Sequence, residues 1–186
     1  MFDLAIIGAG PAGASAALFA AKAGKNVVFF DHDKSITSKA WVENHYGVEG
    51  IKGPDLLNTG QKQAVEHGAQ LVKTEVSSME QTDSGYSIKT NEGKFEAQHI
   101  LFATGMSTKL AEAFELNVVD GTEPRVAKII QTNEEGRTEK PGVWAAGTVA
   151  GVSVHTIITA GDGARVAVNI ISELNGKRYV DHDILK

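Results

Sequence analysis

The sequence predicts an α/β fold with a central parallel sheet and a three-stranded β-meander. Three observations lead to this prediction. Residues 2–30 read as strand, glycine-rich turn, apolar helix and strand; residues 76–98 read as three short strands; residues 143–174 read as a buried strand and an amphipathic helix. With 186 residues, 42% of them hydrophobic, the chain can bury a full core, and we expect a single domain over residues 1–186.

The opening strand, residues 2–7, runs into the turn Gly8-Ala9-Gly10-Pro11-Ala12-Gly13 and an alanine-rich helix. In this arrangement Gly8 allows the tight turn, Gly10 lets the backbone approach a pyrophosphate, and Gly13 lets the helix pack on the strand. The first N–H groups of the helix can bind phosphate oxygens. We interpret the unit as a Rossmann-like dinucleotide site; the glycine spacing alone also fits a βαβ turn without a ligand.

Asp31 supports the dinucleotide interpretation. It follows a second apolar strand, Asn26–Phe30, and lies about 20 residues after the glycines, where an acid holds the adenosine ribose of a bound dinucleotide. We therefore expect Asp31 to accept hydrogen bonds from ribose hydroxyls.

The middle of the chain supplies one helix and further strands. A polar loop over residues 31–39 precedes a helix over about residues 53–67, which Pro54 begins and Gly68 ends. Residues 70–74 read as a strand. The β-meander follows, and its expected strands are 76–82, 86–90 and 94–98.

The remaining elements complete the sheet and close the domain. A separate buried strand is expected over residues 99–103, and later residues 128–132 and a turn at 133–136 lead to Pro141. Val143–Ala146 reads as a buried strand that leads into Gly147. An amphipathic helix is expected over about residues 156–174.

Composition excludes several classes of function. The net charge of -5 gives no reason to expect nucleic acid or an anionic membrane. Residues 4–21 carry no charge, but three glycines, a proline and the absence of a basic segment argue against a membrane span or signal peptide, so we expect a cytoplasmic protein. Because the chain has no cysteine, it cannot form disulfides, thiolate zinc sites or cysteine-ligated clusters, and redox chemistry requires a bound cofactor.

The histidines show no metal-ligand spacing, and we expect no metal site. His45 is either a neighbour of a cofactor or a surface residue, and we favour the surface. Four others are expected to be solvated or structural: His32, His67, His99 and His182.

Two sections of the chain resemble the FAD domain of the thioredoxin reductase family, which belongs to the pyridine nucleotide-disulfide oxidoreductases. The first runs from the N-terminus through Val42-Glu43-Asn44 and Gly53-Pro54 to Ala103-Thr104-Gly105. The second comprises Gly136-Arg137-Thr138, Pro141–Gly147 and Thr159–Ala164, and is the more specific of the two. In that family the flavin lies between the two sections, so the resemblance implies FAD rather than NAD.

The resemblance also implies a ring-binding end of the site. Asn44 lies in the segment that reaches the isoalloxazine ring in the family, and His155 and Thr156 align with a turn whose N–H groups point to the ring. His155 is the candidate catalytic residue, because an imidazole could protonate or polarise the reduced flavin; capping or loop packing is the alternative. The expected cofactor-binding residues are Gly8, Gly10, Pro11, Ala12, Gly13, Asp31, Asn44, Ala103, Thr104, Gly105, Gly147, Thr148, His155 and Thr156.

The chain departs from the family in two respects. In the family an NADPH domain with its own glycine turn and a Cys-x-x-Cys pair separates the two sections, whereas here only 35 residues separate Gly105 from Pro141. A further nucleotide domain needs on the order of 100 residues. We therefore expect an N-terminal section, 1–105, a C-terminal section, 123–186, and a short connector in place of the NADPH domain.

The second departure lies at the flavin itself. The family's alanine-glycine-aspartate, whose carboxylate contacts the ribityl chain, reads Ala146-Gly147-Thr148 here. Threonine lacks the charge-assisted acceptor, a loss of about 1 to 2 kcal/mol. A Rossmann-like domain without a flavin is therefore the alternative to FAD binding.

Two hypotheses of function follow. The first is a minimal FAD-dependent oxidoreductase with an external electron donor, either diffusible or a partner protein, and an unidentified acceptor. The alternative is a non-catalytic flavin-binding electron carrier, sensor or subunit. The missing dithiol excludes the thioredoxin reductase mechanism within this chain, and the resemblance implies a homodimer, because the related reductases pair through their flavin domains.

Overall fold

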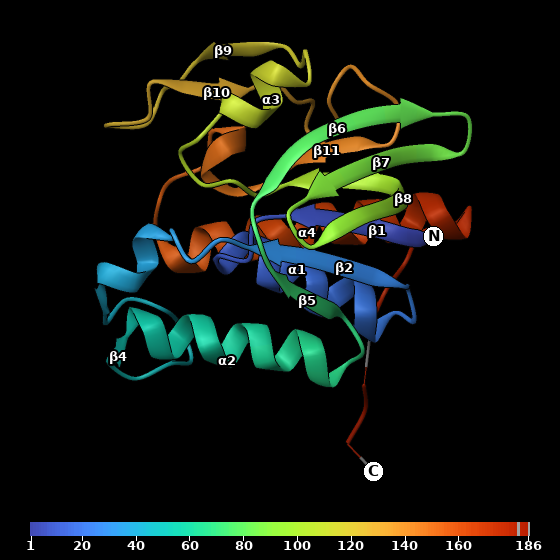
Figure 1. The fold of residues 1–186 in the computed structure, drawn as a ribbon. Helices are drawn as coiled ribbons and strands as arrows, with labels where there is room; N and C mark the ends of the chain where they lie inside the picture. Colours follow the sequence, from blue (N-terminus) through green and yellow to red (C-terminus); the bar gives the residue numbers. More distant parts are fainter. Residues whose placement is uncertain (182, 186) are drawn as a thin grey trace.

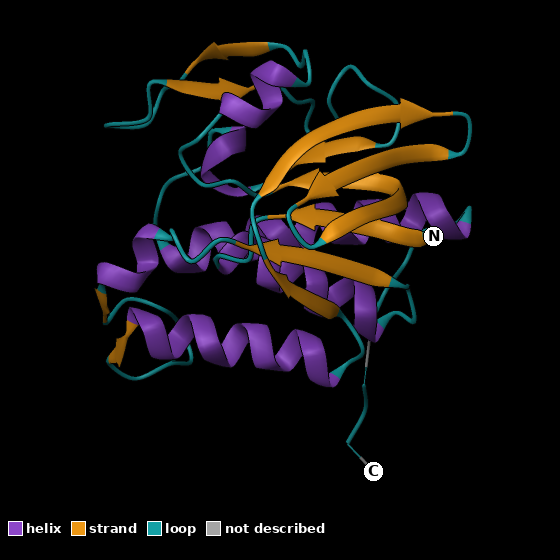
Figure 2. Ribbon diagram, in the orientation of Figure 1, coloured by secondary structure: helices purple, strands orange, loops and turns teal. Residues whose placement is uncertain are grey.

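The computed structural model describes residues 1–181 and 183–185, and the expectation for His182 lies outside them. It confirms the α/β prediction: a central sheet of mostly parallel strands carries its three long helices on one side (Figures 1 and 2). The helices are α1 (Pro11–Lys22), α2 (Gly53–Glu66), α3 (Lys109–Ala113) and α4 (Thr156–Asn175), with short 3₁₀ turns η1 (Ile36–Lys39) and η2 (Gly147–Ala150).

The strands of the main sheet follow the order β5-β2-β1-β8-β7-β6, and β11 also pairs with β8. The pairs β1–β2, β2–β5, β1–β8 and β8–β11 are parallel, whereas β6–β7 and β7–β8 are antiparallel. The bounds of these strands are β1 Phe2–Ile7, β2 Val27–Asp31, β5 Gln70–Lys73, β6 Val76–Thr82, β7 Gly85–Thr90, β8 Gly93–Phe102 and β11 Val143–Ala145.

Strand β8 corrects one sequence prediction. The expected strands 94–98 and 99–103 form a single strand, Gly93–Phe102, because no turn residue interrupts them and partners on both edges pair with the joined segment. Ala97 pairs with Phe2 of β1 on one edge and with Tyr86 of β7 on the other. Further along, β11 pairs with the last three residues of β8 on the edge away from β1. The meander and the parallel sheet are therefore one continuous structure.

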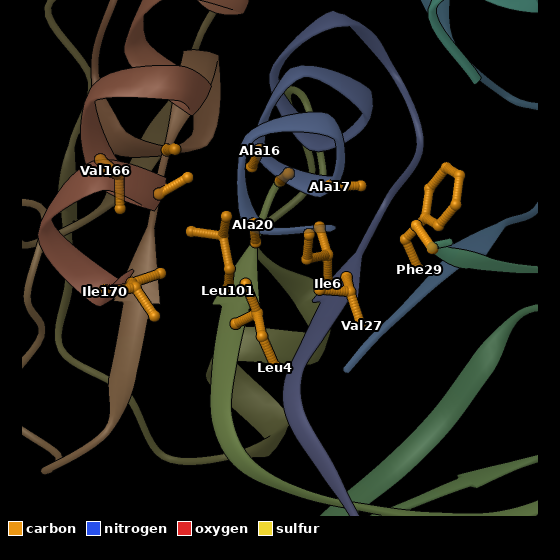
Figure 3. Packing of buried hydrophobic residues seen from close by; sticks show 14 of the residues in the cluster. Leu4, Ile6, Ala16, Ala17, Ala20, Val27, Phe29, Leu101, Val166 and Ile170 are labelled. Carbon is orange, nitrogen blue, oxygen red and sulfur yellow. The ribbon is translucent and has the colours of Figure 1, made fainter. Parts of the chain in front are cut away.

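Each face of the sheet buries its own hydrophobic cluster, because side chains alternate along a strand. In β1, Leu4 and Ile6 pack with α1 and α4 on one face. Figure 3 shows these side chains with the small side chains of Ala16, Ala17 and Ala20, which allow α1 to approach the sheet closely. On the other face, Ala5 and Ile7 pack with residues of the meander.

The segment between Gly105 and Pro141 contains small elements and no second nucleotide-binding unit. Helix α3, which the sequence pattern did not predict, is followed by a hairpin of β9 (Val118–Asp120) and β10 (Lys128–Ile130). In Figure 2 this group lies on the opposite side of the sheet from α2. A second short pair, β3 (Trp41–Val42) and β4 (Ile51–Lys52), brackets the loop that contains Asn44. None of the helices in the described residues combines the length and apolarity that a membrane span requires.

Candidate functional site

A cavity of about 460 Å³ opens at the carboxyl ends of β1, β2, β8 and β11. Ligands of open α/β sheets bind at this edge, where neighbouring strands lead into helices on different sides. Residues from both sequence sections meet here. The predicted site residues that line the cavity are Gly8, Gly10, Pro11, Ala12, Asp31, Ala103, Thr104, Gly105 and Thr148.

The glycine-rich turn is tightly packed at Gly8 and Gly13 and open at Gly10. Gly8 adopts a φ of 110°, and a Cβ there would lie 2.3 Å from the carbonyl oxygen of Ala103. Gly13 does not line the cavity; a Cβ on it would lie 1.8 Å from the carbonyl oxygen of Gly8, so its role is close packing. A Cβ on Gly10 would instead project into open space, with only the Ser35 hydroxyl oxygen near, at 3.4 Å.

Helix α1 begins at this turn without a side-chain cap. Its N-cap residue is Gly10, which has no side chain to accept a hydrogen bond from the first turn, and Pro11 is the first residue of the helix. The first N–H groups of an α-helix have no partner within the helix, so they are donors for an anion at this end of the cavity. The open face of Gly10 and the uncapped helix together fit a dinucleotide pyrophosphate.

Asp31 lies at the end of β2 and is held by three donors. Its Oδ2 accepts hydrogen bonds from Gln61 Nε2 at 2.8 Å and Lys73 Nζ at 2.7 Å, and its Oδ1 accepts one from the Asp33 N–H at 3.0 Å. Gln61 Nε2 also donates to the Ala9 carbonyl oxygen at 3.1 Å, which ties the carboxylate to the glycine-rich turn. Oδ1, with a single donor, keeps an acceptor site for a ribose hydroxyl.

The surroundings of Asp31 favour its ionised form. Burial acts to raise the pKa of this carboxyl, but the hydrogen bonds from Lys73, Asp33 and Gln61 together outweigh it and lower the pKa below its ordinary value of 3.8. Because the pKa is lowered in the folded protein, the ionised carboxyl stabilises the fold above that ordinary value, and its contribution is lost as the pH falls through the folded-state pKa.

We expect Lys73→Met to raise the pKa of Asp31, because burial then acts with one fewer opposing hydrogen bond. An NMR titration of the Asp31 carboxyl carbon measures the change, and acid unfolding should begin at a higher pH. Lys34→Met is the matched control, since Lys34 pairs with Glu75 at 3.4 Å and not with Asp31. An Asp31 titration curve that Lys73→Met leaves unchanged would contradict the prediction.

The opposite wall of the cavity comes from the C-terminal section. Thr148, which is buried, lines the cavity, and Gly147 lies behind it. Gly147 has a φ of 77°, and a Cβ there would lie 2.8 Å from that of Ala12. The Gly147 N–H donates to Asp162 Oδ2 at 2.7 Å. Sequence reasoning included Asp162 only as part of a family motif and gave it no role.

Helix α4 begins beside the loop that contains Asn44. His155 is the N-cap; its exposed side chain contacts the Ser153 hydroxyl at 2.8 Å and does not line the cavity. Thr156 is buried, and its Oγ1 lies 3.0 Å from Nδ1 of His45. The structure therefore corrects the expectation for His45, which is half-buried and tied to α4. No sequence signal links residues so far apart in the chain.

Other side chains complete the description of the site. Asn44 is exposed and does not line the cavity. Residues of the cavity wall that sequence reasoning missed include Lys34, Ser35, Glu75 and Lys109. Within the described residues, no group of three His, Asp or Glu side chains is arranged to hold a metal ion.

His99 lies away from the cavity wall. It is buried and accepts a hydrogen bond from Trp144 Nε1 at 3.1 Å, and burial lowers its pKa. Of the two roles expected for His99, solvated or structural, these contacts agree with the structural one.

Sequence comparison identifies relatives over part of the chain. It is 36% identical over 115 residues to NADPH-dependent thioredoxin reductase 3 of Arabidopsis thaliana, a match that covers 58% of this chain and 22% of that protein. It is 38% identical over 115 residues to a thioredoxin reductase of Helicobacter pylori, with 59% of this chain and 37% of that protein covered. The chain thus matches less than two fifths of the length of these relatives.

Solved structures share the fold. A thioredoxin reductase from Gloeobacter violaceus has a TM-score of 0.80 at 18% identity, covering 99% of each chain. A ferredoxin-flavin thioredoxin reductase from Clostridium acetobutylicum has a TM-score of 0.75 at 16% identity, covering 94% of this chain and 98% of that one. The family model of the pyridine nucleotide-disulphide oxidoreductases matches residues 2–113 and 52–164. This chain contains no cysteine, but it resembles the flavin domain of thioredoxin reductases. Because the family matches cover most of the chain, it belongs to the pyridine nucleotide-disulphide oxidoreductase family.

Proposed function

We propose that the chain is a FAD-dependent oxidoreductase module that takes electrons from a donor outside this chain and passes them to a separate acceptor. The observation that carries the proposal is the cavity between the two sequence sections, with the glycine-rich turn on one wall and Thr148 on the other. The glycine-rich turn and Asp31 by themselves would fit the ADP part of either NAD or FAD. A wall from the late strand and its following turn supports a flavin between the two halves.

The chain's residues would divide the binding of FAD among them. Asp31 would accept the adenosine ribose, the uncapped start of α1 would bind the pyrophosphate, and the Thr148 hydroxyl would contact the ribityl chain. When bound, FAD supplies the hydride and electron transfer chemistry, and the protein supplies orientation and electrostatics. The residues of the cavity wall fit these roles, and each assignment is a proposal.

The start of α4 would bind the ring end. The N-terminus of this 20-residue helix favours negative charge, so it would stabilise charge that develops on the ring without reorganising. We keep His155 as the proposed catalytic residue, because its position as the N-cap places a titratable side chain at this helix end. Asn44 and Thr156 would contact the same end of the flavin.

The purified protein should be yellow and should release FAD, not FMN, on denaturation, because the glycine-rich turn and Asp31 form an adenine dinucleotide site. Absorbance spectroscopy followed by chromatography of the released flavin makes the measurement. FMN in the extract, or a colourless protein that also fails to bind added FAD, would rule out the proposed cofactor.

NADPH and NADH should reduce the bound flavin slowly or not at all. Residues 106–140 form only α3, a hairpin and loops, and nothing there would position a nicotinamide at reacting distance. Anaerobic stopped-flow absorbance tests this, with dithionite as a control that reduces the flavin directly. Rapid, saturable bleaching by either nucleotide would show that the chain has a nicotinamide site of its own.

The alternative function, a non-catalytic electron carrier, sensor or subunit, has one supporting observation. The side chains of Tyr46, the neighbour of His45 in the chain, and of His155, the N-cap of α4, are exposed, as an open docking face for a redox partner would require. Turnover with small acceptors separates the two functions, since a carrier would show none. A homodimer and a cytoplasmic location are further proposals that rest on the family resemblance.

A further inference from the structure

We infer that Asp162 is a positioning residue of the flavin site, which acts through the backbone of Gly147 and Thr148. The inference rests on the proposed function, because it assigns a role in holding FAD. Asp162 lies on α4, outside the cavity wall, and its side chain is 7% exposed. A buried carboxylate of this kind needs partners for both oxygens.

Both oxygens of Asp162 are occupied in different directions. Oδ2 accepts the Gly147 N–H at 2.7 Å, while Oδ1 accepts Arg165 Nε at 3.0 Å and Nη2 at 2.8 Å. Arg165 Nη1 in turn donates to the carbonyl oxygen of Glu134. Arg165 therefore holds the carboxylate through Oδ1, and Oδ2 binds a single main-chain group, the Gly147 N–H.

That main-chain group sets one wall of the cavity. Gly147 begins η2 in a left-handed conformation and packs against Ala12 of the glycine-rich turn's helix. Thr148 follows it directly and lines the cavity. Without Asp162, the buried Gly147 N–H would lack its acceptor, and the turn would have to move to satisfy it. A shift of this turn changes the distance between Thr148 and the opposite wall.

The competing explanation is a purely structural role, in which Asp162 and Arg165 join α4 to the loop that contains Glu134. The two roles use different atoms, so variants can separate them. Asp162→Ala removes both the Gly147 contact and the ion pair, whereas Arg165→Gln removes only the ion pair and the Glu134 contact. Arg165 does not line the cavity and is the matched control.

FAD titrations of the apo-proteins, followed by flavin fluorescence, measure the affinity. Asp162→Ala should bind FAD at least about tenfold more weakly than the wild type, whereas the affinity of Arg165→Gln should change by less than about threefold. Both variants should lower the thermal unfolding temperature of the apo-protein. Visible circular dichroism of the bound flavin should change only in Asp162→Ala. Asp162→Asn in the Arg165→Gln background should bind FAD as tightly as Arg165→Gln alone, because an amide oxygen can accept the Gly147 N–H.

If Asp162→Ala does not fold, Asp162→Leu, which fills the same space without an acceptor, takes its place and should weaken binding equally. Unchanged FAD affinity in the Asp162→Ala and Asp162→Leu variants, or equal losses in Asp162→Ala and Arg165→Gln, would overturn this inference but not the proposed function. A wild-type protein that binds no FAD would overturn the proposed function and this inference with it.

Discussion

Gly10→Val should abolish FAD binding while the apo-protein stays folded. A Cβ at this position meets only the Ser35 hydroxyl oxygen, at 3.4 Å, and the backbone φ of −71° and ψ of −171° suit a branched residue. The added methyl groups would therefore project into the space that we assign to the pyrophosphate. Losing the charge-assisted hydrogen bonds of that group should weaken binding by at least about 100-fold, or about 3 kcal/mol.

The free energy of unfolding of the apo-protein should change by only about 1 kcal/mol in Gly10→Val, since no native contact is displaced. Isothermal titration with FAD and urea unfolding measure the two effects separately. Gly10→Ala is the graded control, which should bind FAD with intermediate affinity. Binding of FAD by Gly10→Val with wild-type affinity would place the cofactor elsewhere in the protein.

Gly163→Ala should strongly destabilise the fold, because α1 and α4 pack together at this residue. A Cβ there would lie 2.0 Å from the carbonyl oxygen of Ala12 and 2.8 Å from its Cα, so the helices must separate. Overpacking against backbone, which cannot rotate away, should cost about 3 kcal/mol or more. Because Ala12 also lines the cavity, FAD affinity should fall with stability.

Gly161→Ala provides a control on the same helix. Gly161 is exposed, and a Cβ on it would meet no atom within 4 Å. Alanine has the higher helix propensity, so this variant should be more stable than the wild type by up to about 1 kcal/mol. Urea unfolding of both variants makes the comparison. Equal effects of the two substitutions would show that α1 and α4 do not pack as closely as described.

Sequence alone determined the parts of the molecule that depend on neighbouring residues. The strand, glycine-rich turn and helix of residues 2–22 are contiguous, and the turn's shape follows from where glycine is required. The position of Asp31 at the end of β2 follows from the same unit. Hydrophobic periodicity likewise predicted α4 over nearly its full length, Thr156–Asn175.

Tertiary structure alone decided which distant groups meet. One strand, β8, replaces two expected strands because it pairs with β7, β11 and β1 along its edges, and pairing across the chain is not visible in local periodicity.

The partners of the polar side chains were equally hidden. His45 contacts Thr156, Asp31 is held by Gln61 and Lys73, and Asp162 reaches Gly147. The type of a polar residue defines its hydrogen-bond donors and acceptors. Its partner, however, is fixed only when packing of the apolar faces brings remote segments together.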